Sequence, residues 1–452
     1  MSYYKKKYFG TDGIRGKANS TTMNAEMALK IGMAAAEFFT RGNKTHYALI
    51  GKDTRLSNYT IEPALVAGFL SMGMNVYLTG PIPTPGVSAL VRSMRCDVGI
   101  MISASHNHYT DNGIKIFDPM GCKLSDKQEA SIEKLIDIKN RVLVKSESLG
   151  RAKRIDDAGG RYIEHLKSKI SFDLKLNGIK IVIDCANGAA YKVAPLILWE
   201  LGAEVIPINV SPDGKNVNKK SGSTDTSDLI KEVLKNKANV GVALDGDADR
   251  VIIVDEKGKQ INGDCILAIL ASHLKEENDL ENNTVIGTVL SNKGLEDYLK
   301  SKKINFLRAN VGDRNIIKEM QKEKCFLGGE PSGHIILGNN NATGDGILAA
   351  LEILGIMIKK QNKLSTLAKI FSPYPQVSKD YIIKKSTKAD KIIQQSKSEI
   401  LKLKTGFKRD IRLVIRKSGT ENKIRIMVES KDKKLANKIV SQSLDILNRA
   451  NL

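Results

Sequence analysis

The chain has 452 residues, of which 71 are lysine or arginine and 50 are aspartate or glutamate, so its formal charge at pH 7 is +21. Hydrophobic residues make up 41% and charged residues 27%, which excludes an intrinsically disordered protein. No run of about 18 apolar residues occurs, so we expect no membrane-spanning helix. The first residues are cationic but no apolar stretch follows them, so we expect no secretory signal.

The cysteines are the next constraint. They are odd in number, far apart and never spaced as CxxC, which argues against a disulfide framework or a zinc ribbon. We therefore expect free thiols in a cytoplasmic protein. The five are Cys96, Cys122, Cys185, Cys265 and Cys325.

The positive charge raises the question of nucleic-acid binding. Lysines are spread along the whole chain, aromatic residues are only 5%, and no binding motif for DNA or RNA is present, so we expect no nucleic-acid partner. A lysine-rich solvated surface is the simplest interpretation. The surplus also suits a small anionic substrate, because a cationic cleft concentrates anions.

The first third of the chain alternates short apolar runs with amphipathic segments. Near-continuous apolar runs separated by helices predict parallel strands that are buried on both faces. In chain order we expect a strand, a helix, a strand, a helix and a strand, at 46–55, 60–73, 74–80, 83–95 and 97–105.

The same alternation of apolar runs and amphipathic segments recurs twice, at a spacing of about 100 residues. This spacing is far longer than the repeat length of a solenoid, so it favours several similar domains over a repeat array. The second stretch predicts strands and helices at 178–188, 189–202, 203–210, 228–238 and 239–250. The third stretch has its segments at 263–274, 284–292, 294–302, 326–337 and 345–360.

The tail differs from these stretches. Two prolines in Ser372-Pro-Tyr-Pro375 suggest a linker. Beyond it we expect a small α+β domain with a strand, a helix, two strands and a closing helix, at 377–385, 388–403, 411–419, 422–430 and 433–450. The predicted fold class is three similar α/β domains with mixed, mostly parallel sheets plus this C-terminal domain. We place the four domains at 1–157, 158–257, 258–372 and 373–452.

The motif Asp245-Gly-Asp247-Ala-Asp249-Arg250 follows an apolar run. In an extended segment residues i, i+2 and i+4 point to one side, so the three carboxylates are expected to converge and to need a cation such as Mg²⁺ or Ca²⁺. An EF-hand loop also spaces aspartates in this way. Its sixth position needs glycine but is Arg250 here, and Val251–Val254 continues as a strand, so we favour a different metal site.

Three further motifs carry candidate chemistry. Ser103-Ala-Ser105-His106-Asn107 follows the strand that ends near residue 102, at the edge where doubly wound sheets bind ligands, but no GxSxG elbow surrounds it. Next comes Asp111-Asn-Gly-Ile-Lys115, which we expect to be a tight turn that presents Lys115 as a phosphate clamp or, with a lowered pKa, as a general base. The turn Gly328-Gly-Glu330-Pro-Ser332-Gly-His334 presents a carboxylate, a hydroxyl and an imidazole.

The tail contains Arg416-Lys417-Ser418-Gly419-Thr420-Glu421 between two predicted strands. A glycine-containing turn with exposed amides, two hydroxyls and flanking cations can cradle a phosphate. Walker A and GxGxxG motifs are absent from the sequence, so ATP and NAD lack their usual binding loops.

Taken together and in order, these segments and Phe9-Gly-Thr-Asp-Gly-Ile-Arg-Gly16 resemble the α-D-phosphohexomutase superfamily over essentially the whole chain. The resemblance implies four domains around a central cleft, the last of them similar to the TATA-binding protein. It implies an isomerase that interconverts glucosamine 6-phosphate and glucosamine 1-phosphate, feeding UDP-N-acetylglucosamine synthesis. Phosphomannomutase and phosphoglucomutase relatives use the same mechanism and are the alternative.

The resemblance also implies roles for individual residues. Ser105 would be the phosphoserine that donates and recovers the phosphoryl group. Asp245, Asp247 and Asp249 would bind one Mg²⁺ together with a phosphate oxygen on Ser105. The other residues implied to be catalytic are Arg15, His106, Lys115, Arg250 and His334.

Glu330 and Ser332 would bind sugar hydroxyls. The residues implied to hold the phosphate that is not transferred are Arg416, Ser418, Gly419, Thr420 and Arg425. The activator would be glucosamine 1,6-bisphosphate or a related hexose bisphosphate. The implied partner is a phosphosugar, with no membrane and with a homodimer as one possible assembly.

The chain departs from the superfamily pattern at three positions, with His108 and Asn422 where proline is usual and Pro331 where the glucosamine branch often has glutamine. Lys417 and the pair Asp313-Arg314 favour that branch. A phosphatase is a second hypothesis, but alkaline-phosphatase-like sites usually recruit several histidines, and no such cluster is visible.

Overall fold

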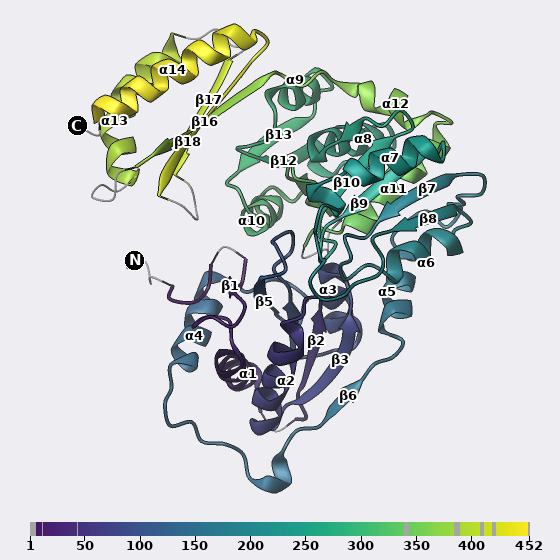
Figure 1. Ribbon diagram of the computed structural model, residues 1–452, viewed down its shortest axis with the longest axis vertical. Coiled ribbons are helices and arrows are strands. Elements are labelled where there is room, and N and C mark those ends of the chain that lie inside the picture. The colour runs from purple at the N-terminus through teal and green to yellow at the C-terminus, as the bar shows by residue number, and fades with distance from the viewer. Residues whose placement is uncertain are drawn as a thin grey trace. The chain divides into compact units, whose positions relative to one another are not determined.

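The computed structural model describes residues 6–10, 12–42, 44–338, 343–383, 389–406, 411–417 and 422–450, without the side chain of Lys404. It divides into two compact units (Figure 1). The first comprises Met1–Thr288 and Ile304–Ile370, and the second comprises Val289–Lys303 and Phe371–Leu452. Within the described ranges, no helix is long and apolar enough to cross a membrane.

The first sheet has six strands in the order β1-β5-β4-β2-β3-β6. The strands β4, β2, β3 and β6 run parallel, whereas β5 is antiparallel to both β4 and β1. All five residues of β4 are buried, as expected for a central strand covered on both faces. The bounds are β1 (Ile14–Lys17), β2 (Tyr47–Lys52), β3 (Asn75–Pro81), β4 (Val98–Ile102), β5 (Asp111–Phe117) and β6 (Ala152–Arg154).

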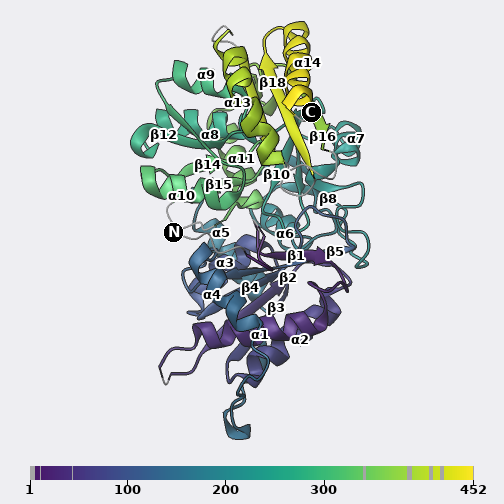
Figure 2. The same ribbon diagram turned by 90° about the vertical axis from the view of Figure 1, so that its left-hand side faces the viewer.

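Helices cover this sheet, and α1 and α2 lie side by side against it (Figure 2). Their apolar residues share one core with the sheet and with α4, while α3 packs against β2, β4 and α5. Ser125 and Gln128 form a capping box that begins α4. The bounds are α1 (Ala25–Phe39), α2 (Asn58–Ser71), α3 (Thr84–Ser93), α4 (Asp126–Ile136) and α5 (Ala158–Lys167).

The second sheet has five strands in the order β11-β10-β9-β7-β8, with a parallel half and an antiparallel half. The strands β9 and β10 are completely buried and are joined by the turn 245–250. The bounds are β7 (Lys180–Asp184), α6 (Val193–Glu200), β8 (Glu204–Ile208), α7 (Ser227–Lys235), β9 (Val240–Leu244), β10 (Val251–Asp255) and β11 (Gln260–Ile261).

The third sheet has four strands in the order β13-β12-β14-β15, and only the β14–β15 pair is antiparallel. That pair forms a hairpin whose turn carries Glu330. The bounds are α8 (Gly263–Glu276), β12 (Thr284–Thr288), β13 (Asn305–Ala309), α10 (Asp313–Glu323), β14 (Leu327–Gly329), β15 (Ile335–Leu337), α11 (Gly346–Lys359) and α12 (Leu364–Leu367). Short 3₁₀ turns lie at η1 (Ser146–Ser148), η2 (Gly222–Thr224), η3 (Glu281–Asn283) and η4 (Ala368–Ile370).

The second unit contains an antiparallel sheet in the order β16-β18-β17, with α13 and α14 packed against it around one apolar core. The segment Val289–Lys303 also belongs to this unit. The bounds are α9 (Lys293–Ser301), β16 (Gln376–Ile382), α13 (Ala389–Thr405), β17 (Ile411–Lys417), β18 (Lys423–Ser430) and α14 (Lys433–Ala450).

The predicted fold class is confirmed, with three mixed α/β sheets and a smaller α+β unit. The five cysteines are free, as expected.

The prediction of a tight turn at Asp111–Lys115 is wrong, because these residues lie in β5 and pair with both neighbouring strands. Alternate residues of this strand, Ile114 and Ile116, are buried in the core, and this buried face outweighs the turn tendency of Asp-Asn-Gly.

Candidate functional site

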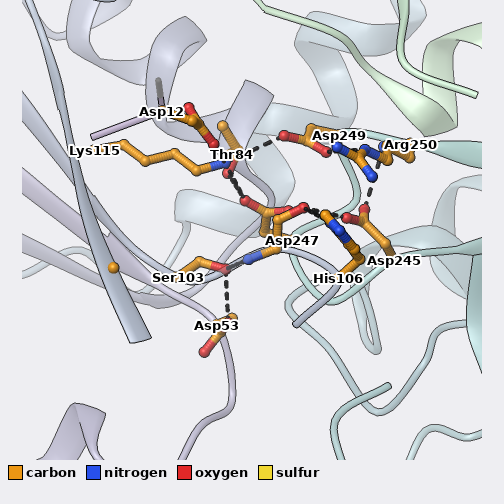
Figure 3. Close-up of polar contacts among 12 residues, drawn as sticks. Asp12, Asp53, Thr84, Ser103, His106, Lys115, Asp245, Asp247, Asp249 and Arg250 are labelled. Carbon is orange, nitrogen blue, oxygen red and sulfur yellow. Dashed lines mark hydrogen bonds and ion pairs between the residues drawn. The ribbon is translucent and has the colours of Figure 1, made fainter. Parts of the chain in front are cut away.

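A cluster of three carboxylates lies in the turn between β9 and β10. Asp245, Asp247 and Asp249 are buried, and one oxygen from each lies within 4.8 Å of the others (Figure 3). The predicted convergence is therefore confirmed. It does not come from an extended segment, however, because the chain turns here and Ala248 has a φ of 56°.

The electrostatics of this cluster fit a hard divalent cation. Burial and the neighbouring Asp249 and Asp247 raise the pKa of Asp245 well above its usual value. One oxygen each of Asp247 and Asp249 (Oδ1) is buried and has no hydrogen-bond partner among the described residues. Three clustered carboxylates with open oxygen lone pairs are the ligand set that Mg²⁺ or Ca²⁺ prefers.

Ser105 faces this cluster from the end of β4. Its Oγ donates a hydrogen bond to Asp245 Oδ2 at 2.6 Å, and its backbone is left-handed with a φ of 53°. The Nδ1 atom of His106 lies 3.4 Å from Ser105 Oγ. Burial and the cations Arg250 and Arg15 lower the pKa of His106 to about 4, so its imidazole is neutral at pH 7. The serine hydroxyl therefore lies between a carboxylate and a neutral ring.

Lys115 reaches the same carboxylates from β5. Its Nζ lies 2.7 Å from Asp247 Oδ2, 3.2 Å from Asp249 Oδ2 and 3.3 Å from Asp12 Oδ2 (Figure 3). Burial alone would lower the pKa of Lys115, but the three carboxylates outweigh it and raise the pKa well above its usual value. The side chain is a cation in this arrangement, not a lysine with the lowered pKa that the general-base interpretation requires.

The two predicted arginines lie at the edge of this cluster. Arg15, on β1, forms an ion pair with Asp12. The Nε atom of Arg250 lies 3.8 Å from Asp249 Oδ1, and its backbone N–H donates to Asp245 Oδ1 at 3.2 Å. Arg250 therefore places positive charge next to Asp245, and Arg15 places it near Asp12, Asp247 and Asp249.

The β14–β15 hairpin brings its residues to the same carboxylates. His334 is buried, and its Nδ1 lies 3.6 Å from Asp249 Oδ1, while its Nε2 accepts a hydrogen bond from the Gly344 N–H at 3.0 Å. Burial would lower the pKa of His334, but Asp249 and Asp313 raise it overall. Glu330 Oε1 accepts the Gly312 N–H at 2.9 Å.

Ser332 lies on the same hairpin as Glu330. Its Oγ lies 3.3 Å from Glu330 Oε2, so the hydroxyl and the carboxylate form one polar pair. The structure thus brings Ser105, Lys115, Arg250 and His334 to the carboxylate cluster, while Glu330 and Ser332 bond to each other on the hairpin that carries His334.

The tail residues belong to the second unit and are described separately. Arg416 on β17 and Arg425 on β18 are directly opposite each other in the antiparallel register, and Asp380 on β16 is opposite Arg425. Burial and the neighbouring Arg425 lower the pKa of Arg416. Two paired cations make this position suitable for an anion. Ser418, Gly419 and Thr420 lie outside the described residues.

Several residues of the site were not singled out from the sequence. Thr84 Oγ1 donates to Asp247 Oδ2 at 2.5 Å, and the Thr84 N–H donates to Asp247 O at 2.9 Å. Lys123 forms ion pairs with Asp12, just before β1, and with Asp313, the first residue of α10. These ion pairs connect the region of the first sheet with that of the third. Asp12 stands inside the quoted Phe9–Gly16 motif, so the signal for it was present. Thr84 and Lys123 carry no local signal.

Comparisons with known proteins cover nearly the whole chain. Family models described as phosphoglucomutase/phosphomannomutase match in four parts: alpha/beta/alpha domain I at 6–141, domain II at 160–258, domain III at 262–374 and the C-terminal domain at 379–446. A phosphoglucosamine mutase from Zymomonas mobilis is 50% identical over 98% of this chain and 99% of the relative. Another from Parvibaculum lavamentivorans is 51% identical over 96% and 97%.

Solved structures share the fold at low identity. A phosphoglucomutase/phosphomannomutase family protein from Burkholderia thailandensis has a TM-score of 0.81 at 22% identity, covering 97% of this chain and 96% of that one. The N-acetylphosphoglucosamine mutase of Aspergillus fumigatus, solved with GlcNAc-6P and magnesium, has a TM-score of 0.68 at 15% identity, covering 99% and 96%.

Proposed function

Because the chain belongs to the phosphoglucosamine mutase family, we propose that it interconverts glucosamine 6-phosphate and glucosamine 1-phosphate through a phosphorylated Ser105. The observation that carries this proposal is the position of Ser105 Oγ, 2.6 Å from a carboxylate of the buried aspartate cluster. A phosphoryl group on this oxygen would lie between the aspartates and the cations Arg15, Lys115 and Arg250.

The carboxylate cluster would hold one Mg²⁺ through Asp245, Asp247 and Asp249, with an oxygen of the Ser105 phosphate as a further ligand. The metal supplies positive charge that stabilises the transferring oxygens. The open Oδ1 atoms of Asp247 and Asp249 support this assignment.

The transfer itself requires few groups from the protein. A sugar hydroxyl oxygen attacks the phosphorus on Ser105, the P–Oγ bond breaks, and a new P–O bond to the sugar forms. The hydroxyl proton needs an acceptor. Lys115 is held as a cation by the carboxylates around it, so we assign this role to His334 in its neutral form, whose ring lies beside Asp249. In the return half-reaction the Ser105 hydroxyl loses its proton and attacks the other phosphate of the 1,6-bisphosphate, the P–O bond between that phosphate and the sugar breaks, and the freed sugar oxygen takes up a proton.

The remaining residues would orient the sugar. Glu330 and Ser332 offer a carboxylate and a hydroxyl to sugar hydroxyls. We assign the phosphate that is not transferred to Arg416 and Arg425, with Ser418, Gly419 and Thr420, because two arginines in direct register attract an anion. A hexose 1,6-bisphosphate would serve as activator, since it restores a phosphate lost from Ser105 by hydrolysis. We expect the enzyme to act in the cytoplasm.

The proposal is tested by kcat/KM for glucosamine 1-phosphate against glucose 1-phosphate and mannose 1-phosphate. Each assay contains Mg²⁺ and the matching 1,6-bisphosphate and follows the 6-phosphate product. A large preference for the amino sugar supports the proposal. Equal or better turnover of glucose or mannose phosphate would contradict the substrate assignment while leaving the mechanism intact.

A further inference from the structure

Arg55 is a fully buried arginine just beyond β2, and the hydrogen bonds that it makes within the described residues go to groups outside the carboxylate cluster. Its Nε donates to Asp53 Oδ2 at 2.7 Å. Its two Nη atoms donate to four backbone carbonyl oxygens, all in the segment that carries Ser105. They belong to Ser105, Asn107, His108 and Asp111. An arginine has five N–H donors, so Asp53 uses one of them and the four carbonyls of this loop match the other four.

These contacts determine which way the loop faces. With its carbonyl groups turned toward one buried guanidinium, the segment 105–111 wraps around Arg55. The Ser105 N–H is also held, because it donates to Ser103 Oγ at 2.9 Å. Ser103 Oγ in turn donates to Asp53 Oδ2 at 2.7 Å (Figure 3). Ser103, itself bound to Asp53, therefore accepts the hydrogen bond of the Ser105 N–H, and Arg55 donates to the Ser105 carbonyl.

The same loop is held from the second sheet's side by Asn218. Its Nδ2 donates to Ser105 O at 2.8 Å and to Asn107 O at 3.2 Å, the two oxygens that Arg55 Nη2 also binds. Gly246 packs close to this point, since a Cβ there would lie 2.6 Å from Ser105 O. The serine loop and the metal loop therefore meet with no spare room.

Left-handed backbone is disfavoured at a residue other than glycine, because its Cβ comes too close to the following carbonyl oxygen. Ser105 adopts it with a φ of 53°. The hydrogen bonds to its carbonyl and its N–H offset this cost and fix the direction of its side chain. Without them the loop could relax, and the distance from Ser105 Oγ to Asp245 would no longer be set.

We propose that Arg55, assisted by Asn218, is a positioning residue that fixes the backbone of the Ser105 loop so that Oγ faces the aspartate cluster. It acts through backbone carbonyls and touches neither substrate nor metal. This inference rests on the proposed function for its kinetic consequence, but the fixing of the loop is a property of the protein alone.

The test compares R55K with N218A and with a matched control, R141K. Lysine keeps the charge next to Asp53 but loses the planar set of donors that reaches four carbonyls. Arg141 is also a largely buried arginine that pairs with a carboxylate, Glu37, and donates to a backbone carbonyl, that of Leu135, and both of these partners lie outside the Ser105 loop. It therefore reports the general cost of replacing a buried arginine.

Three quantities are measured on full-length protein: hydrogen exchange of the loop amides, the fraction of Ser105 phosphorylated by a 1,6-bisphosphate, and kcat and KM. We expect R55K to exchange faster in the loop and to lose kcat by roughly 100-fold with KM changed by less than about threefold, since displacement of a reacting group by about 1 Å costs that much. N218A should shift in the same direction by a smaller factor. R141K should match wild type in all three.

Unchanged loop exchange in both R55K and N218A would overturn the proposal, as would equal losses of kcat in R55K and R141K. If R55K does not fold, N218A decides by the same readouts. Wild-type protein that neither becomes phosphorylated on Ser105 nor turns over phosphosugars would instead refute the proposed function, and the exchange data would still decide whether Arg55 fixes the loop.

Discussion

Replacing Lys115 by methionine removes a buried cation while approximately keeping the volume of the side chain. Lys115 is 1% exposed and its Nζ lies within 3.3 Å of oxygens from Asp12, Asp247 and Asp249. Removing one partner of a buried ion pair typically costs about 3–5 kcal/mol, because the remaining charges lose their compensation. We therefore expect the metal-free K115M protein to lose stability by about that amount.

The same substitution should strengthen metal binding. In the metal-free protein the Lys115 ammonium binds Asp247 and Asp249, the carboxylates assigned to Mg²⁺, so lysine and metal compete for the same negative charge. Removing each 1.4 kcal/mol of this competition strengthens Mg²⁺ binding about tenfold, and we expect at least a tenfold gain in Mg²⁺ affinity. Turnover should fall sharply, because the transferring phosphoryl group loses a cation.

Urea unfolding with EDTA and calorimetric titration with Mg²⁺ measure the two effects. K123M is the control, since Lys123 is a similarly buried lysine that pairs with Asp12 and Asp313 instead of the aspartate cluster. It should lose stability without a gain in Mg²⁺ affinity. Weaker or unchanged Mg²⁺ binding by K115M would refute the electrostatic reasoning.

Three further predictions follow from the site and its surroundings. D247N should weaken Mg²⁺ binding by about tenfold or more, since a ligand loses its charge, and an unchanged Mg²⁺ titration of activity would count against the cluster as the metal site. R416A should raise KM for the phosphosugar by about tenfold with a smaller effect on kcat, because it removes ground-state binding. Steady-state kinetics measure this effect, with K417A on the same strand as the control variant. Burial raises the pKa of Asp345 to about 6, although Tyr162 donates a hydrogen bond to it. The protonated carboxyl group therefore stabilises the folded state fully below about pH 4, and this stabilisation is lost as the pH rises through 6. Urea unfolding at several pH values should therefore show D345N gaining up to about 3 kcal/mol relative to wild type across this window, and a constant difference would contradict the assignment.

The sequence was sufficient to predict the fold class because most elements carry a clear period. The strands β7 and β9 read as apolar runs, and the tail segments read as alternating strands with amphipathic helices between them. The strand β5 was missed, because Asp111-Asn112-Gly113 has strong local turn tendency and the tertiary pairing with β4 and β1 overrides it.

The candidate site was predictable only where its residues stand in a compact motif. The aspartates and Ser105 each follow a buried strand, so their place at a sheet edge could be anticipated. Arg55 could not, since its partners are carbonyl oxygens about 50 residues away and a buried arginine has no periodic signature. Lys123 likewise depends on Asp313, 190 positions further along the chain.

The central claim is that Ser105 carries the phosphoryl group between the two positions of an amino sugar. The most direct measurement is single-turnover transfer: phosphorylated protein is mixed with glucosamine 6-phosphate, and both the phosphate on Ser105 and the 1,6-bisphosphate formed are followed by mass spectrometry. The account predicts that loss of phosphate from Ser105 matches formation of glucosamine 1,6-bisphosphate, and that S105A forms none. Release of inorganic phosphate in place of the bisphosphate, or wild-type turnover by S105A, would contradict it.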